Sequence, residues 1–166
     1  ARDGGLYVPD TIPEMSKADI AALAGLSYEE IAFRVMRPFV GDTFTDAEFR
    51  GAIERAYAGF GHAARAPLVQ LAPNHFLLEL FHGPTAAFKD FGARFLAACM
   101  RQVGATDGLE RTILVATSGD TGAAVADAFH GKPKLRVVVL YPDGRVSPRQ
   151  AHQPGCFGDN ILTPRV

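Results

Sequence analysis

The chain has 166 residues, of which 48% are hydrophobic and 21% are charged, so it is long enough for one soluble globular domain with a real core. Its net charge of -1, and the lack of lysine and arginine clusters beside aromatic residues, argue against a nucleic-acid partner or an anionic membrane surface. No apolar stretch is long enough to span a membrane and no leader pattern opens the sequence, so we expect a cytoplasmic protein.

The first part of the chain carries three helix starts. Each start has a serine or threonine followed three residues later by an acidic residue, which is the pattern of a capping box. The pairs are Ser16 with Asp19, Ser27 with Glu30, and Thr45 with Glu48. Apolar residues at the staple positions flank each pair. Glycine and proline stop signals should end these helices, so residues 1–66 are predicted to form a small, mainly helical subdomain.

From Pro67 onward strands and helices alternate. The expected elements are strands at 67–71 and 76–81, a helix at 86–103, a strand at 112–116, a helix at 121–129 and a strand at 135–141. The apolar runs are continuous, which is typical of strands buried on both faces of a parallel sheet. Residues 67–150 are therefore predicted to form a βαβαβ unit of the α/β class, an open parallel sheet with helices on both faces.

The end of the chain is harder to interpret. Ser147 and Pro148 resemble a helix start, with proline at the first helical position. Pro154 then interrupts the pattern, and residues 156–166 show no period. No structure is predicted for residues 151–166.

The cysteines and histidines do not indicate a metal site. Cys99 and Cys156 lack metal-binding spacing, and Cys99 falls on the apolar face of a predicted helix, where a small buried residue is expected. No two histidines lie four residues apart on one helix.

Ligands of parallel α/β sheets bind at the carboxyl ends of the strands. Three loops are expected to leave strands at that edge, at residues 82–85, 117–122 and 142–147. The topology would therefore bring Lys89, which follows the first loop, close to the second loop and to Arg145. His82 is expected to be a loop residue bonded to the backbone rather than a general base.

Lys89 lies between Phe88 and Phe91 at the start of a predicted helix. A lysine among aromatic rings loses solvation of its charged form, and an amine that is neutral part of the time can attack a carbonyl to form a Schiff base. The alternative is an ordinary solvated lysine, with the phenylalanines in the core.

The second loop has two interpretations as well. It consists of Thr117, Ser118, Gly119, Asp120, Thr121 and Gly122. The glycines let a ligand approach backbone N–H groups, and the loop adds hydroxyls and the start of a helix. This combination suits a carboxylate or a phosphate. The competing interpretation is a simple strand-to-helix turn with Asp120 as the helix cap.

Four segments match a known family in order and spacing. They are DGGLYVP at 3–9, LELFHGPTAAFKDFGARF at 78–95, ATSGDTGAAVADAFHG at 116–131 and VVVLYPDGRVSPRQ at 137–150. With these segments the chain resembles the threonine synthase family, pyridoxal-phosphate enzymes of the tryptophan-synthase-β-like class (fold type II). The second and third segments are the most specific.

The resemblance implies a reaction and a site. The family is a group of lyases that convert O-phospho-L-homoserine and water to L-threonine and phosphate, the last step of threonine biosynthesis. Lys89 would form the internal aldimine with pyridoxal 5'-phosphate, beside Phe88. Thr117 and the loop from Ser118 to Gly122 would hold the amino-acid end of the substrate, and Arg145 would contact its phosphate. The oligomeric state stays open.

The sequence also departs from the family. Its members are more than twice as long, and their glycine-rich loop for the cofactor phosphate lies far downstream of the part matched here. We therefore expect a fragment or truncated copy with little or no activity alone, and with an unpaired sheet edge and an uncovered apolar face. Two alternatives remain open: another lyase of the same cofactor class, such as a dehydratase, and a non-catalytic remnant that binds a partner chain or a small anion.

Overall fold

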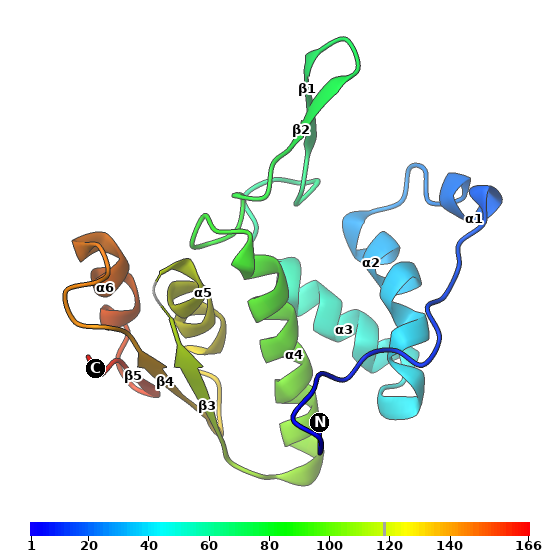
Figure 1. The fold of residues 1–166 in the computed structure, drawn as a ribbon. Coiled ribbons are helices and arrows are strands. Elements are labelled where there is room, and N and C mark those ends of the chain that lie inside the picture. Colours follow the sequence, from blue (N-terminus) through cyan, green and yellow to red (C-terminus); the bar gives the residue numbers. More distant parts are fainter. Residues whose placement is uncertain (118) are drawn as a thin grey trace.

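The computed structural model describes residues 1–117 and 119–166 (Figure 1). Ser118, which belongs to the predicted second loop, lies outside the described residues. Within the described part of the chain, no helix is both long enough and apolar enough to span a membrane.

Three helices form the first part of the chain, and each begins where its capping pattern predicts. They are α1 (Lys17–Ala21), α2 (Tyr28–Met36) and α3 (Asp46–Tyr57), with 3-10 turns η1 (Arg37–Phe39) and η2 (Gly41–Thr43) before α3. Complete capping boxes start α1 and α3. At α2 the Ser27 hydroxyl accepts from the Glu30 N–H, but the Glu30 carboxylate binds Arg34 and Arg50 instead of the cap.

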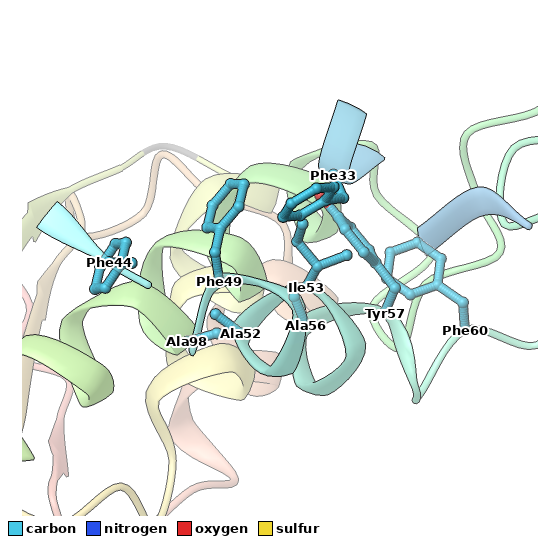
Figure 2. Packing of buried hydrophobic residues seen from close by; sticks show 9 residues of the cluster. All are labelled: Phe33, Phe44, Phe49, Ala52, Ile53, Ala56, Tyr57, Phe60 and Ala98. Carbon is cyan, nitrogen blue, oxygen red and sulfur yellow. The ribbon is translucent and has the colours of Figure 1, made fainter. Parts of the chain in front are cut away.

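The first core is aromatic and lies between α2, α3 and α4 (Lys89–Asp107). Figure 2 shows its buried members, which are Phe33, Phe44, Phe49, Ala52, Ile53, Ala56, Tyr57, Phe60 and Ala98. The rings of Phe44 and Phe49, the apolar residues that flank the capping pair of Thr45 and Glu48, stack with 6.2 Å between their centroids. Phe91 and Phe95 of α4 pack against this cluster, so α4 closes the core of the helical region.

The two strands expected first do not join the parallel sheet. Instead, β1 (Leu68–Ala72) and β2 (His75–Leu78) pair antiparallel in a hairpin that projects from the body (Figure 1). Pro73 and Asn74 form the turn between them, with Asn74 at φ 58°. Proline and asparagine favour such a turn, and every residue of both strands is exposed. The prediction of a first βαβ unit is therefore wrong.

The remaining strands form the predicted parallel sheet. β3 (Arg111–Ala116), β4 (Leu135–Leu140) and β5 (Ile161–Leu162) lie side by side in that order. The helix α5 (Asp120–Phe129) connects β3 to β4, and α6 (Pro148–Gly155) connects β4 to β5. The α/β class is thus confirmed. The tail forms α6, with Pro154 in its last turn, and β5, although its sequence shows no period.

Helices α4 and α5 cover one face of this sheet. Their second core consists of Ala97, Ala126, Ala128, Phe129, Leu135, Val137, Val139 and Ile161. On the opposite face, the side chains of Leu114 and Leu162 are 68% and 64% exposed. The expected uncovered apolar face is therefore present in the described part of the chain.

Candidate active site

Lys89 is the first residue of α4. The arrows of β3 and β4 point toward this N-terminal end of the helix (Figure 1). Its side chain is half-buried, and its Nζ lies 4.4 Å from the centroid of the Phe88 ring. Phe91 packs against Phe60 in the first core instead. Among the described residues Nζ has no hydrogen bond and no ion pair, so the amine is available to a ligand.

A tight turn precedes Lys89 and is held by the next residue along the helix. The Ala86 N–H donates to the Gly83 carbonyl at 3.1 Å, and Ala86 adopts φ 58° in the left-handed region. The fully buried Asp90 carboxylate accepts from the Thr85 N–H at 2.9 Å and from its hydroxyl at 2.7 Å. A Cβ at Gly83 would lie 2.4 Å from Asp90 Oδ2, so no side chain fits there. Sequence reasoning missed this role of Asp90.

The start of the same turn is anchored to the chain after α3. The His82 carbonyl accepts from the Gly61 N–H at 2.8 Å, and the His82 ring lies 5.0 Å from the His62 ring between centroids. His82 Nε2 lies 2.7 Å from a carboxylate oxygen of Glu79. His82 is thus a loop residue bonded to the backbone, in agreement with the simpler of its two interpretations.

Thr117 shapes the second loop, which joins β3 to α5. Its hydroxyl accepts from the Gly119 N–H at 3.1 Å and the Gly122 N–H at 3.2 Å, and donates to the Gly119 carbonyl at 3.1 Å. A hydroxyl has one proton and two lone pairs, so these bonds use its full capacity. In this arrangement Thr117 supports the loop and has no bonding position left for a ligand.

The first turn of α5 combines a negative side chain with the positive N-terminal end of the helix. Gly119 occupies the cap position and Asp120 is the first helical residue, so the alternative of Asp120 as the cap is wrong. Asp120 is exposed and Thr121 half-buried, at a helix end where backbone N–H groups lack helical partners. A Cβ at Gly122 would lie 2.9 Å from Val139 Cγ1, so this glycine lets α5 approach β4 closely.

The third loop meets the second through a residue that sequence reasoning missed. Gln150 belongs to the capping box at the start of α6, and its Nε2 would lie 2.8 Å from a Cβ at Gly119. No sequence signal links these residues, because the fold alone brings them together. Arg145 is exposed, its N–H donates to the Pro142 carbonyl at 3.3 Å, and it forms no ion pair with any described residue.

Taken together, the N-terminal ends of α4 and α5 lie at one end of the molecule (Figure 1). This end combines an accessible amine at Lys89 with a helix N-terminus, which favours an anionic group such as a carboxylate. The arrangement suits covalent capture of a carbonyl compound next to an anion. Among the described residues, Arg145 has no hydrogen bond or ion pair with either feature.

Comparisons with known proteins agree on one family. A family model described as "Threonine synthase N terminus" matches residues 1–57. A threonine synthase from Pseudomonas aeruginosa is 46% identical over 97% of this chain and 34% of its own length, and one from Escherichia coli is 41% identical over 99% and 37%. The chain thus spans about a third of the length of these curated relatives.

The solved structures show the same coverage. The crystal structure of a threonine synthase from Brucella melitensis, described as PLP bound, has a TM-score of 0.90 and 46% identity over 98% of this chain and 35% of that chain. A yeast threonine synthase has a TM-score of 0.91 at 36% identity over 99% of this chain and 35% of that chain.

Proposed function

Because this chain corresponds along its whole length to the N-terminal third of threonine synthases, we propose that it carries the lysine-bearing part of a threonine synthase active site. The proposed reaction converts O-phospho-L-homoserine and water to L-threonine and phosphate. One observation carries the proposal: a half-buried Lys89 whose Nζ has no polar partner among the described residues, on a turn fixed by Asp90. Residues 1–66, 67–150 and 151–166 remain our proposed division of the chain.

The residues at this site fit pyridoxal 5'-phosphate, the cofactor that the family implies. The group binds proteins through a lysine amine, and Lys89 offers that amine beside the exposed ring of Phe88. When bound, it supplies an electron sink that stabilises carbanions. Lys89 and Phe88 would hold it.

The side chains of the site have separate roles in this proposal. Lys89 Nζ takes a proton from a substrate carbon and returns it to another, because an amine near a reacting carbon acts as a general base and then as a general acid. The N–H groups at the start of α5, with Ser118 and Thr121, orient the carboxylate of the substrate. Asp120 accepts a hydrogen bond from a polar group of the substrate, and Arg145 contacts its phosphate.

Reductive labelling tests the assignment of Lys89. The protein is mixed with pyridoxal 5'-phosphate, reduced with borohydride and mapped by mass spectrometry. The lysines of the chain are Lys17, Lys89, Lys132 and Lys134. We expect selective labelling at Lys89. Lys132 is the most stringent internal control, because burial and nearby guanidinium groups lower the pKa of its ammonium and make it a more reactive amine.

Two variants complete the labelling experiment. Lys89→Arg should abolish the label at this position and leave the weak background on the other lysines unchanged. Lys17→Arg, at an exposed residue of α1, should leave the labelling of Lys89 intact. Equal labelling of all lysines, or preferential labelling of Lys132, would contradict the assignment.

Turnover gives a second, independent measurement. We expect the 166-residue chain alone to convert O-phospho-L-homoserine slowly or not at all, because the family's loop for the cofactor phosphate lies outside the matched third. In a polypeptide that joins this chain to the rest of a threonine synthase, Lys89→Ala should lower the rate by about three orders of magnitude, the scale expected for a covalent catalytic group. A mild defect would refute the role of Lys89.

A further inference from the structure

A small pocket between α3, α4 and α5 is lined by four cationic side chains. They are Arg55 from α3, Arg94 and Arg101 from α4, and Lys132, which follows α5. The apolar floor is made of Ala97, Ala98 and Ala128. Arg94 and Arg101 follow Lys89 by 5 and 12 positions, so the pocket lies about 8 to 18 Å further along the helix axis and is separate from the candidate active site.

Only one of the four cations has a carboxylate partner among the described residues. Arg94 Nη1 donates to Asp127 at 2.7 Å and Arg94 Nε donates to the Ala56 carbonyl at 3.0 Å, so this guanidinium joins α3 to α5. Within the described residues, the one hydrogen bond of the Arg55 side chain is a 3.4 Å contact with Gln102. No described carboxylate forms an ion pair with Arg55, Arg101 or Lys132.

Lys132 shows that this concentration of positive charge is costly without a counterion. Its side chain is half-buried, and burial lowers the pKa of the ammonium, with further lowering by Arg101 and Arg94 and only partial compensation by Asp127. Like charges that lie close together at a partly desolvated position repel each other, and each also loses solvation by water. An anion bound among them offsets both the repulsion and the lost solvation.

We propose that the pocket formed by Arg55, Arg94, Arg101 and Lys132 binds a small phosphate-type oxyanion. Guanidinium groups recognise phosphate oxygens through paired N–H donors, and the ammonium adds a point charge. The small apolar floor limits the ligand to a compact group such as inorganic phosphate. This inference is independent of the proposed function, because none of its residues belongs to the candidate active site.

Phosphate titration followed by isothermal calorimetry and thermal unfolding tests the proposal, with sodium chloride at matched ionic strength as the reference. We expect saturable phosphate binding by the natural sequence and a rise in its unfolding temperature. The double variant Arg101→Gln/Lys132→Gln should bind at least about tenfold more weakly, the scale of one lost charge-assisted contact. Lys17→Gln removes a charge from α1, outside the pocket, and should bind phosphate like the natural sequence.

The unfolding temperature in phosphate-free buffer separates binding from folding. The double variant should unfold at the same or a higher temperature than the natural sequence there, because it relieves repulsion among the cations. Three outcomes would overturn the proposal. They are a shift of the unfolding temperature by chloride equal to that by phosphate, a lack of saturable phosphate binding by the natural sequence, and equal phosphate affinity in the double variant.

Discussion

At the scale of single residues, Asp90 determines where Lys89 is held. Its buried carboxylate accepts hydrogen bonds from the N–H and the hydroxyl of Thr85. It also fills the space that a side chain at Gly83 would need. A negative group in the first turn of a helix also stabilises the positive end of the helix dipole. The two effects together explain why an acid tolerates complete burial at this position.

We predict that Asp90→Asn destabilises the protein and misplaces Lys89. The amide can still accept from the Thr85 N–H and can donate to the Thr85 hydroxyl, but both charge-assisted hydrogen bonds and the negative charge at the helix start are lost, so the unfolding free energy should fall by about 1.5 to 3 kcal/mol. Reductive labelling of Lys89 should also slow, which a loss of stability at an unrelated site would not cause. Asp10→Asn is the matched control, because Asp10 is exposed. Unchanged stability and labelling would refute this role of Asp90.

Sequence reasoning found Lys89 but not the residues that position it. An acid next to a helix start has the same sequence signature whether it is solvated or buried, so Asp90 could not be distinguished from a surface residue. Gln150 and Gly119 lie 31 positions apart, and only the folded chain brings them together. The sequence predicts that the Thr117 hydroxyl binds a ligand, but its hydrogen bonds within the loop depend on a local geometry that residue types do not specify.

At the scale of helices and strands, local sequence signals predict where a helix starts but not which strands pair with each other. Capping boxes involve residues three positions apart, so the starts of α1 and α3 could be identified directly. The apolar runs at 67–71 and 76–81 resemble buried strands, so the pattern alone predicts that they join the parallel sheet. The Pro73-Asn74 turn pairs them with each other instead, because the backbone preferences of proline and asparagine at the turn determine the pairing and hydrophobicity does not.

We predict that Thr45→Ala weakens α3 in a pH-dependent way. Hydrogen bonds from the Thr45 N–H and hydroxyl hold the pKa of Glu48 below its ordinary value of 4.5. The unfolded chain therefore binds this proton at a higher pH than the folded chain, and the stabilisation is complete above pH 4.5 and is lost as the pH falls. At neutral pH the substitution should cost about 1 kcal/mol of unfolding free energy, measured by denaturant titration.

The difference between Thr45→Ala and the natural sequence should then shrink in acid. Thr43→Ala serves as the control, since Thr43 is exposed and lies in η2 just before the cap. The variant keeps the backbone N–H that binds Glu48, so a difference that stays constant from neutral pH to well below 4.5 would mean that the hydrogen bond from the Thr45 hydroxyl to this carboxylate does not contribute.

At the scale of the whole molecule, the sheet is covered by helices on one side only in the described part of the chain. Leu114 and Leu162 occupy the open side, and Leu68, Leu71 and Phe76 of the hairpin are also more than half or about half exposed. Exposed apolar residues that share one face of a sheet mark an interaction face or an aggregation hazard. The composition of the chain could not reveal it, because the same apolar residues would serve equally well in a closed core.

We predict that charges on the open face of the sheet reduce self-association of the chain. Leu114→Lys with Leu162→Lys should lower both the fluorescence of a bound apolar dye and the light scattering at high protein concentration, while the helical signal stays unchanged. Leu109→Lys is the matched control, because Leu109 is 60% exposed but lies outside the sheet. Equal effects of the control and the double variant would show that the face itself has no special tendency to associate.

Helix α4 has one more consequence, because both cores are built against it. Phe91, Phe95 and Ala98 belong to the aromatic core, whereas Ala93 and Ala97 belong to the core beneath the sheet. Neither core can open without exposing one side of this helix, so the middle of α4 exchanges its amide protons with solvent only when the cooperative unit as a whole unfolds. The hairpin, which contributes to neither core, can open on its own while α4 stays closed. Lys89 is the first residue of α4, and the anchored turn at 82–88 separates it from the hairpin, which ends at Leu78.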